Sequence, residues 1–245
     1  MASVTDVTGK GKQAASGGNA IAREAGGVMH EHVYEKLREG LISGQLAPGR
    51  TLSVRRLASE FDVSAMPARE AIRRLVAIGA LELTDTRRVT IAKMSVRKFE
   101  EIKVARLELE PVLAAFALDA IAGKAREKTK LIRTLTKIDA LLNEAIKQGD
   151  VTDYTKYNSD FHFELYKASD ATVLLGLVES LWMQFGPFMR IVIGRLGTSC
   201  LVDDRHKEII EAIETGDKDT LRAALRADVL HGMENIKAVD FEVPS

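Results

Sequence analysis

Four polar residues in the C-terminal half of the chain have the types and spacing to bind a metal ion. Asn158 and His162 are four residues apart, so they lie on one side of a helix, next to an apolar stripe. His206 and Asp228 each fall within a further apolar stripe, where a carboxylate needs a partner. Helical bundles build metal sites from such inward-facing groups. We therefore predict that these four residues converge on one cavity.

Two imidazoles and one carboxylate suit zinc or nickel, with His162 and His206 as nitrogen ligands and Asp228 as the charged oxygen ligand. Asn158 offers only a neutral amide. The site then either binds a metal weakly or holds a ligand without one. The alternative interpretation of His162 and of His206 is an inward histidine that only fills the core.

A second group of residues has the chemistry to bind DNA. The segment "DVSAMPAREAIRRL" at 62–75 is typical of an amphipathic helix with Pro67 in its first turn, where the missing N–H costs little. Arg69 and Arg73 lie four residues apart on the polar side. Arginine there suits guanine edges or phosphates. A solvated arginine face without a ligand is the alternative.

The charge of the chain does not by itself indicate a nucleic-acid partner. It has 245 residues, with 35 basic and 35 acidic side chains. Between Arg50 and Lys93, however, nine basic residues stand against five acidic ones, a net charge of +4. Cys200 is the only cysteine, which excludes an intrachain disulfide and favours the cytoplasm. No segment has the apolar length of a membrane span, so we expect no membrane partner.

The elements that position the arginines follow one another closely. Helical periodicity covers 30–43 and ends at Gly44. A short helix capped by Ser53 is followed by a tight connection and by a second helix, which Ser64 should cap. Two β-branched runs between 80 and 92 then predict a hairpin with a basic tip. Two short helices, a tight turn and a hairpin describe a winged helix-turn-helix.

From Ser95 onward the pattern is helical throughout. Six helices are predicted, at 96–122, 126–148, 151–169, 172–195, 199–215 and 217–238. The predicted fold class is therefore mainly α, an N-terminal winged helix-turn-helix followed by an antiparallel all-helical bundle. The predicted domains are a flexible tail at 1–28, a DNA-binding domain at 29–93, a linker at 94–98 and a helical domain at 99–240.

Residues 33–92 resemble the DNA-binding domain of the GntR family. The resemblance rests on "LREGLISGQLAPGRTLS", "RRLASEFDVS", "PAREAIRRLVAIGALEL" and the hairpin, in the family's order and spacing. It implies that the residues in contact with DNA are Arg55, Ser64, Ala65, Met66, Arg69 and Arg87. The polar face of the second helix adds Arg73 to this set. Ala65 and Met66 stand where the family often has Arg and Thr, and Arg88 stands where the wing usually has Gly, which leaves the base preference open.

The C-terminal half resembles the FCD ligand-sensing domain of the FadR-type branch of this family. The matching segments are "RLELEPVLAAFAL" at 106–118, "NSDFHFELYKASD" at 158–170 and the segment 203–228. The resemblance implies a helical bundle that dimerises and binds a small carboxylate effector, often beside a divalent metal. It makes Arg106 and Arg190 candidates to bind that carboxylate. The alternative for Arg106 is a surface ion pair with Glu110.

Together these features predict a cytoplasmic, ligand-responsive transcriptional regulator that binds a palindromic operator as a homodimer. An effector would bridge helices of the bundle and shift the bundle against residues 93–97. One alternative is an architectural DNA-binding dimer without an effector. The other alternative is a metal-dependent hydrolase. The sequence argues against it, because it contains no Glu-x-x-His or His-Glu-x-x-His spacing, no nucleophile elbow and no phosphate loop.

Overall fold

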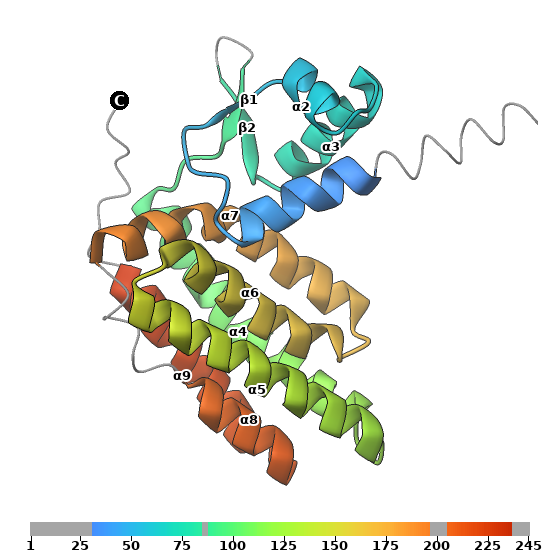
Figure 1. Cartoon of the computed structure of the whole chain (residues 1–245), viewed down its shortest axis with the longest axis vertical. Helices are drawn as coiled ribbons and strands as arrows, with labels where there is room; N and C mark the ends of the chain where they lie inside the picture. The colour runs from blue at the N-terminus through green and yellow to red at the C-terminus, as the bar shows by residue number, and fades with distance from the viewer. Residues whose placement is uncertain (1–30, 85–87, 197–204, 237–245) are drawn as a thin grey trace, which may run out of the picture.

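A computed structural model describes residues 31–84, 88–196 and 205–236 of the chain. Figure 1 shows a small N-terminal part, with its helices and hairpin, above a bundle of longer helices. The predicted tail at 1–28 and the wing residue Arg87 lie outside the described residues.

The N-terminal part begins with a helix at 31–42, whose residues Val33, Leu37 and Leu41 are buried on one side. Helix α2 (Val54–Glu60) begins after Ser53, whose Oγ accepts the N–H of Arg56 as predicted. Helix α3 (Ala65–Ala77) follows after a connection in which Asp62 has a φ of 50°. Aspartate tolerates this left-handed conformation better than most residues, which allows the tight turn between the two helices.

The sheet of this part has three strands, one more than predicted. Strands β2 (Leu81–Leu83) and β3 (Val89–Ile91) form the expected antiparallel hairpin. Strand β1 (Thr51–Leu52) pairs with the other side of β3, which gives the order β1-β3-β2. The sequence did not predict β1, because two residues are too few to show an alternating pattern.

The bundle consists of the helices that follow: α4 (Val96–Ala120), α5 (Ala125–Gln148), α6 (Val151–Lys167), α7 (Thr172–Leu196), α8 (His206–Thr215) and α9 (Lys218–Ile236). Helix α4 packs against α7 and α9, α6 packs against α5 and α7, and α8 packs against α5 and α9. The predicted fold class is confirmed. Ser95 accepts the N–H of Lys98 and caps α4, so residues 96–98 of the predicted linker form the first turn of this helix.

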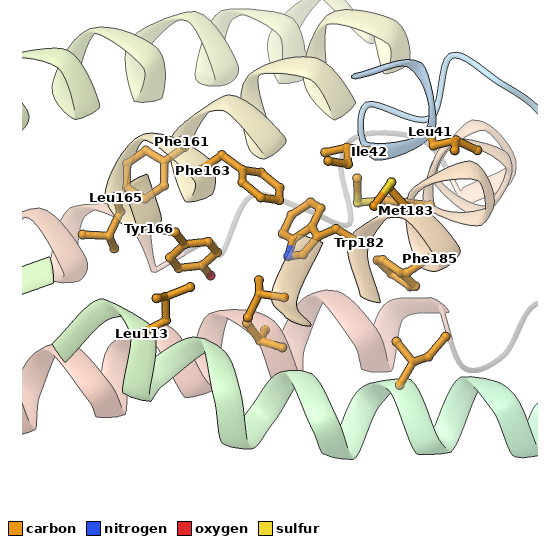
Figure 2. Close-up of a cluster of buried hydrophobic side chains, with 14 of the residues drawn as sticks. Leu41, Ile42, Leu113, Phe161, Phe163, Leu165, Tyr166, Trp182, Met183 and Phe185 are labelled. Carbon is orange, nitrogen blue, oxygen red and sulfur yellow. The ribbon is translucent and has the colours of Figure 1, made fainter. Parts of the chain in front are cut away.

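Helix α7 joins the two parts of the molecule. A Cβ atom at Gly186 would lie 2.5 Å from the carbonyl oxygen of Ile42 and closer still to that of Leu41. Figure 2 shows the segment that carries Leu41 and Ile42 next to α7. Earlier along the same helix, Glu179 forms an ion pair with Arg38 of the N-terminal helix. The N-terminal part therefore rests directly on α7. None of the described helices is long and apolar enough to cross a membrane.

Candidate functional site

Helix α3 presents one polar face to solvent. Ala65, Met66, Arg69 and Arg73 are exposed, whereas Pro67, Ala68, Ala71, Ile72 and Leu75 are buried against the rest of the N-terminal part. Arg55 on α2 is also exposed. The described residues that were predicted to contact DNA are thus all accessible.

Ser64 stands at the N-cap of α3, but its side chain makes no capping hydrogen bond, so the prediction of a side-chain cap is wrong. An N-cap side chain accepts the N–H of the second or third helical residue. The third residue here is Pro67, which has no N–H to donate. The exposed Ser64 hydroxyl is therefore not used by the helix.

Arg74, a neighbour on the same helix, has a different role. Its guanidinium lies 3.6 Å from the centroid of the Tyr34 ring and 2.9 Å from the Glu31 carboxylate, both on the N-terminal helix. Arg73 is 73% exposed and has a 3.4 Å contact with Glu70. The Arg74 side chain is itself 42% exposed, but its contacts tie α3 to the N-terminal helix, which those of Arg73 do not.

Three of the four predicted metal ligands meet inside the bundle. His162 of α6, His206 of α8 and Asp228 of α9 each offer a ligand atom, and these atoms lie within 4.8 Å of one another. The Nε2 atom of His162 is 3.2 Å from Oδ2 of Asp228. Both imidazoles are buried, and the Asp228 side chain is 10% exposed.

His206 is fixed from two sides. Its ring stacks on Phe161, with the ring centroids 3.8 Å apart. Its Nδ1 atom lies 3.3 Å from Oδ1 of Asp139, a buried carboxylate of α5. We did not predict a role for Asp139, although it falls between Leu135 and Leu142 of an apolar stripe. That position is the same signal that identified Asp228.

Asp228 is held in its ionised form. Its Oδ1 atom accepts the backbone N–H of Arg205 at 3.2 Å, just before α8 begins. Burial alone would raise the pKa of Asp228, but the close contact with His162 and the nearby His206 outweigh burial and bring this pKa well below its usual value. The cluster therefore contains a negative charge that can attract a cation.

Asn158, the fourth predicted ligand, lies one helical turn before His162 and is half-buried. Its Nδ2 atom has a 3.9 Å contact with the sulfur of Met189 on α7. Its role as a ligand stays a prediction.

A buried polar network adjoins the cluster, centred on Glu110 of α4. One carboxylate oxygen accepts from Nε of Arg106 at 2.5 Å and from the indole N–H of Trp182 at 3.1 Å. The other accepts from the Tyr166 hydroxyl at 2.5 Å, and that hydroxyl is 3.1 Å from Nδ1 of His162. Figure 2 shows the Tyr166 oxygen and the Trp182 nitrogen facing α4. The network reaches the cluster through His162.

Arg106 lies within this network instead of on the surface, so the alternative of an exposed ion pair with Glu110 is wrong. Its guanidinium carbon is 4.3 Å from the ring centroid of Trp182 and 4.8 Å from that of Phe185. An effector carboxylate would have to share this guanidinium with Glu110. Arg106 remains a predicted effector ligand.

Arg190 lies farther along α7, eight residues or about 12 Å beyond Trp182. It is half-buried beside the turn that follows the N-terminal helix, since a Cβ atom at Gly44 would lie 3.1 Å from the Arg190 Cβ. This places the second predicted effector ligand near the junction between the two parts.

Comparisons with known proteins agree with this organisation. Residues 29–91 match the model of the bacterial regulatory proteins of the gntR family, and residues 101–231 match the FCD domain. The HTH-type transcriptional regulator McbR of Escherichia coli is 27% identical over 195 residues, which is 79% of this chain and 86% of that protein. The gluconate operon transcriptional repressor of Bacillus subtilis is 27% identical and covers 76% of each chain.

The fold of a solved E. coli McbR/YncC structure is similar, with a TM-score of 0.76 at 24% sequence identity over 85% of this chain and 96% of that one. The FCD match alone spans just over half of the chain. The relatives are named as transcriptional regulators, which indicates a regulator rather than an enzyme. Together with the GntR and FCD matches, this makes the chain a ligand-responsive transcriptional regulator. It belongs to the GntR family, with a GntR helix-turn-helix domain that binds operator DNA followed by an FCD domain.

Proposed function

We propose that this regulator senses a small carboxylate-bearing effector through a divalent metal ion, and that it binds a palindromic operator as a homodimer. The observation that supports the sensing site is the convergence of His162, His206 and Asp228 from three helices of one buried interior. A DNA-binding dimer without an effector does not require such a cluster.

The donor set fits zinc or nickel. Two ligand atoms that share one zinc ion lie about 3–4 Å apart, so atoms within 4.8 Å of one another need only small adjustments. A histidine that binds a metal usually donates its other nitrogen to a carboxylate. Oδ1 of Asp139 lies 3.3 Å from Nδ1 of His206, an ion-pair distance without hydrogen-bond geometry, so Asp139 is the carboxylate placed to serve as that partner. When bound, the metal would supply a Lewis-acid centre for an anionic oxygen.

Three protein ligands leave coordination positions open. A carboxylate oxygen of the effector suits such a position beside a borderline metal. One relative is named for a gluconate operon, and gluconate carries a carboxylate, which supports this effector class for the present chain. Asn158, one turn from His162, would contribute an amide to the same space.

The test is a thermal-shift measurement on protein freed of metal by a chelator. Addition of zinc or nickel should raise the melting temperature, and small carboxylic acids should raise it further only when metal is present. Neutral analogues of the same acids serve as the control. A melting temperature that responded to neither metal nor acids would contradict the proposed sensor and favour the architectural dimer.

The signal has a direct route to the DNA-binding domain through α7. The Trp182 ring is 5.3 Å from the His162 ring, and Gly186, one turn later, contacts the backbone of Leu41 and Ile42. A displacement of α7 on effector binding would therefore move the DNA-binding domain itself. This contact adds to the route through residues 93–97 that the sequence suggests.

Replacing Arg69 by alanine should weaken operator binding by about 1–3 kcal/mol, a roughly 5- to 150-fold loss of affinity, because a base or phosphate contact is lost. Fluorescence anisotropy with operator DNA at physiological salt measures this loss. Arg126→Ala removes the same charge from the exposed start of α5 and should change the affinity little. If the two variants bound the operator with equal affinity, Arg69 would not be a DNA-contacting residue.

The operator complex should contain two chains on one two-fold symmetric site. A single helix-turn-helix covers one half-site, and half-sites lie one helical turn, about 34–36 Å, or a multiple of it apart. Light scattering of the free protein and footprinting of the complex check this. A monomer that protects a single half-site would contradict it.

A further inference from the structure

The hydrogen-bond network around Glu110 determines which nitrogen of His162 carries a proton. Glu110 is fully buried, and its neighbours Arg106 and Trp182 have only donors to offer. Its carboxylate therefore serves as an acceptor in every one of these contacts. The remaining close neighbour is the Tyr166 hydroxyl, 2.5 Å from Oε2, a distance typical of a hydroxyl that donates to a carboxylate.

Tyr166 has a single hydroxyl proton, and Glu110 receives it. Toward His162 the same hydroxyl can only accept, so the Nδ1 atom of His162, 3.1 Å away, must be the donor. A neutral imidazole has one N–H, which here is at Nδ1. Its lone pair is then at Nε2, the nitrogen that faces Asp228.

This arrangement leaves two acceptors facing each other. The Nε2 lone pair and Oδ2 of Asp228 are 3.2 Å apart, and they attract only if a cation lies between or beside them. That cation is either a proton on Nε2 or a metal ion. The opposite tautomer would place an N–H at Nε2 and would exclude the metal.

We propose that Tyr166, oriented by Glu110, is a positioning residue that keeps the proton of His162 on Nδ1 and so presents Nε2 to the metal. This inference takes from the proposed function that a metal ion binds at the cluster. The position of the proton on His162 does not depend on the proposed function. The two imidazoles would then be oriented independently. The carboxylate of Asp139 would orient His206. The hydroxyl of Tyr166, hydrogen-bonded to the Glu110 carboxylate, would orient His162.

The variant Tyr166→Phe tests the proposal because it removes the hydroxyl and keeps the buried ring. Zinc affinity, measured by competition with a chromophoric chelator, should fall about 10- to 100-fold. Tyr157→Phe makes the same change on the same helix, where the ring contacts Lys156 and not the cluster, and it should leave the affinity unchanged. Melting temperatures of both metal-free variants show whether the fold is retained.

A second measurement does not depend on metal binding. Nitrogen-15 NMR of the imidazoles in the metal-free protein should show a proton on Nδ1 of His162. Glu110→Gln, whose amide can donate to Tyr166 and release the hydroxyl proton toward His162, should shift the proton to Nε2. If the unaltered protein bound no metal, the proposed function would fail alone. Unchanged zinc affinity in Tyr166→Phe, or an unprotonated Nδ1 in the unaltered protein, would overturn the present inference.

Discussion

Replacing Gly186 by alanine should push the DNA-binding domain away from the helical bundle. The added methyl group would lie 2.5 Å from the carbonyl oxygen of Ile42 and closer to that of Leu41, and both are backbone atoms that cannot rotate away. Gly44, with a φ of +69°, faces Gly186 from the other side of the contact. Overpacking of this kind costs about 1–3 kcal/mol or more in the free energy of unfolding. Thermal and denaturant unfolding measure it.

Gly176→Ala is the matched control. Gly176 lies on the same helix, and a Cβ atom there would meet nothing within 4 Å. Alanine forms helices better than glycine by about 1 kcal/mol, so this variant should be as stable as the parent or more stable. If Gly186→Ala were as stable as Gly176→Ala, the close packing of the N-terminal part on α7 would be wrong.

The same variant separates sensing from response. The cluster of His162, His206 and Asp228 does not involve Gly186, so metal binding should persist in Gly186→Ala. The effect of metal and carboxylate on operator affinity should be reduced, because the contact that transmits it is displaced. If the response of operator affinity to metal and carboxylate were undiminished, the signal would pass through the connection at residues 93–97 and not through the contact at Gly186.

Replacing His206 by alanine should lower zinc affinity more than 100-fold, since even second-shell changes cost about 10- to 100-fold. The stabilisation by bound metal, about 2.7 kcal/mol at a free concentration one hundred times the Kd, should disappear with it. His162→Ala should act in the same way. The comparison is the shift in melting temperature between chelator-treated and zinc-loaded protein.

Loss of the buried His206 ring also leaves a cavity beside Phe161, which lowers stability without any metal. The metal-dependent shift within each variant, and not its absolute melting temperature, is therefore the measure. His231→Ala on α9, three residues beyond Asp228 and outside the cluster, should keep the full shift. If His162→Ala and His206→Ala also kept it, the cluster would be a structural feature of the core.

The sequence by itself determined the helices, the hairpin and the residues that point inward. Burial of an amphipathic helix follows its own period, so apolar stripes placed His162, His206 and Asp228 in the bundle interior, where the structure finds them together. The same reasoning separated the exposed Arg69 from the buried Ala68 and Ile72 on α3. These properties depend on residues a few positions apart, which a sequence displays directly.

Tertiary structure decided which elements touch and which partner each polar group takes. The pairing of β1 with β3, the meeting of Glu110 with Tyr166, and the approach of Gly186 to Ile42 all join distant segments. Arg106 and Glu110 have the spacing of an ordinary surface pair, and only the packing of α4 against α7 and α9 buries them. Local periodicity predicts that a side chain is buried, but it does not identify the residues against which that side chain packs. Such a contact depends on the relative placement of two helices.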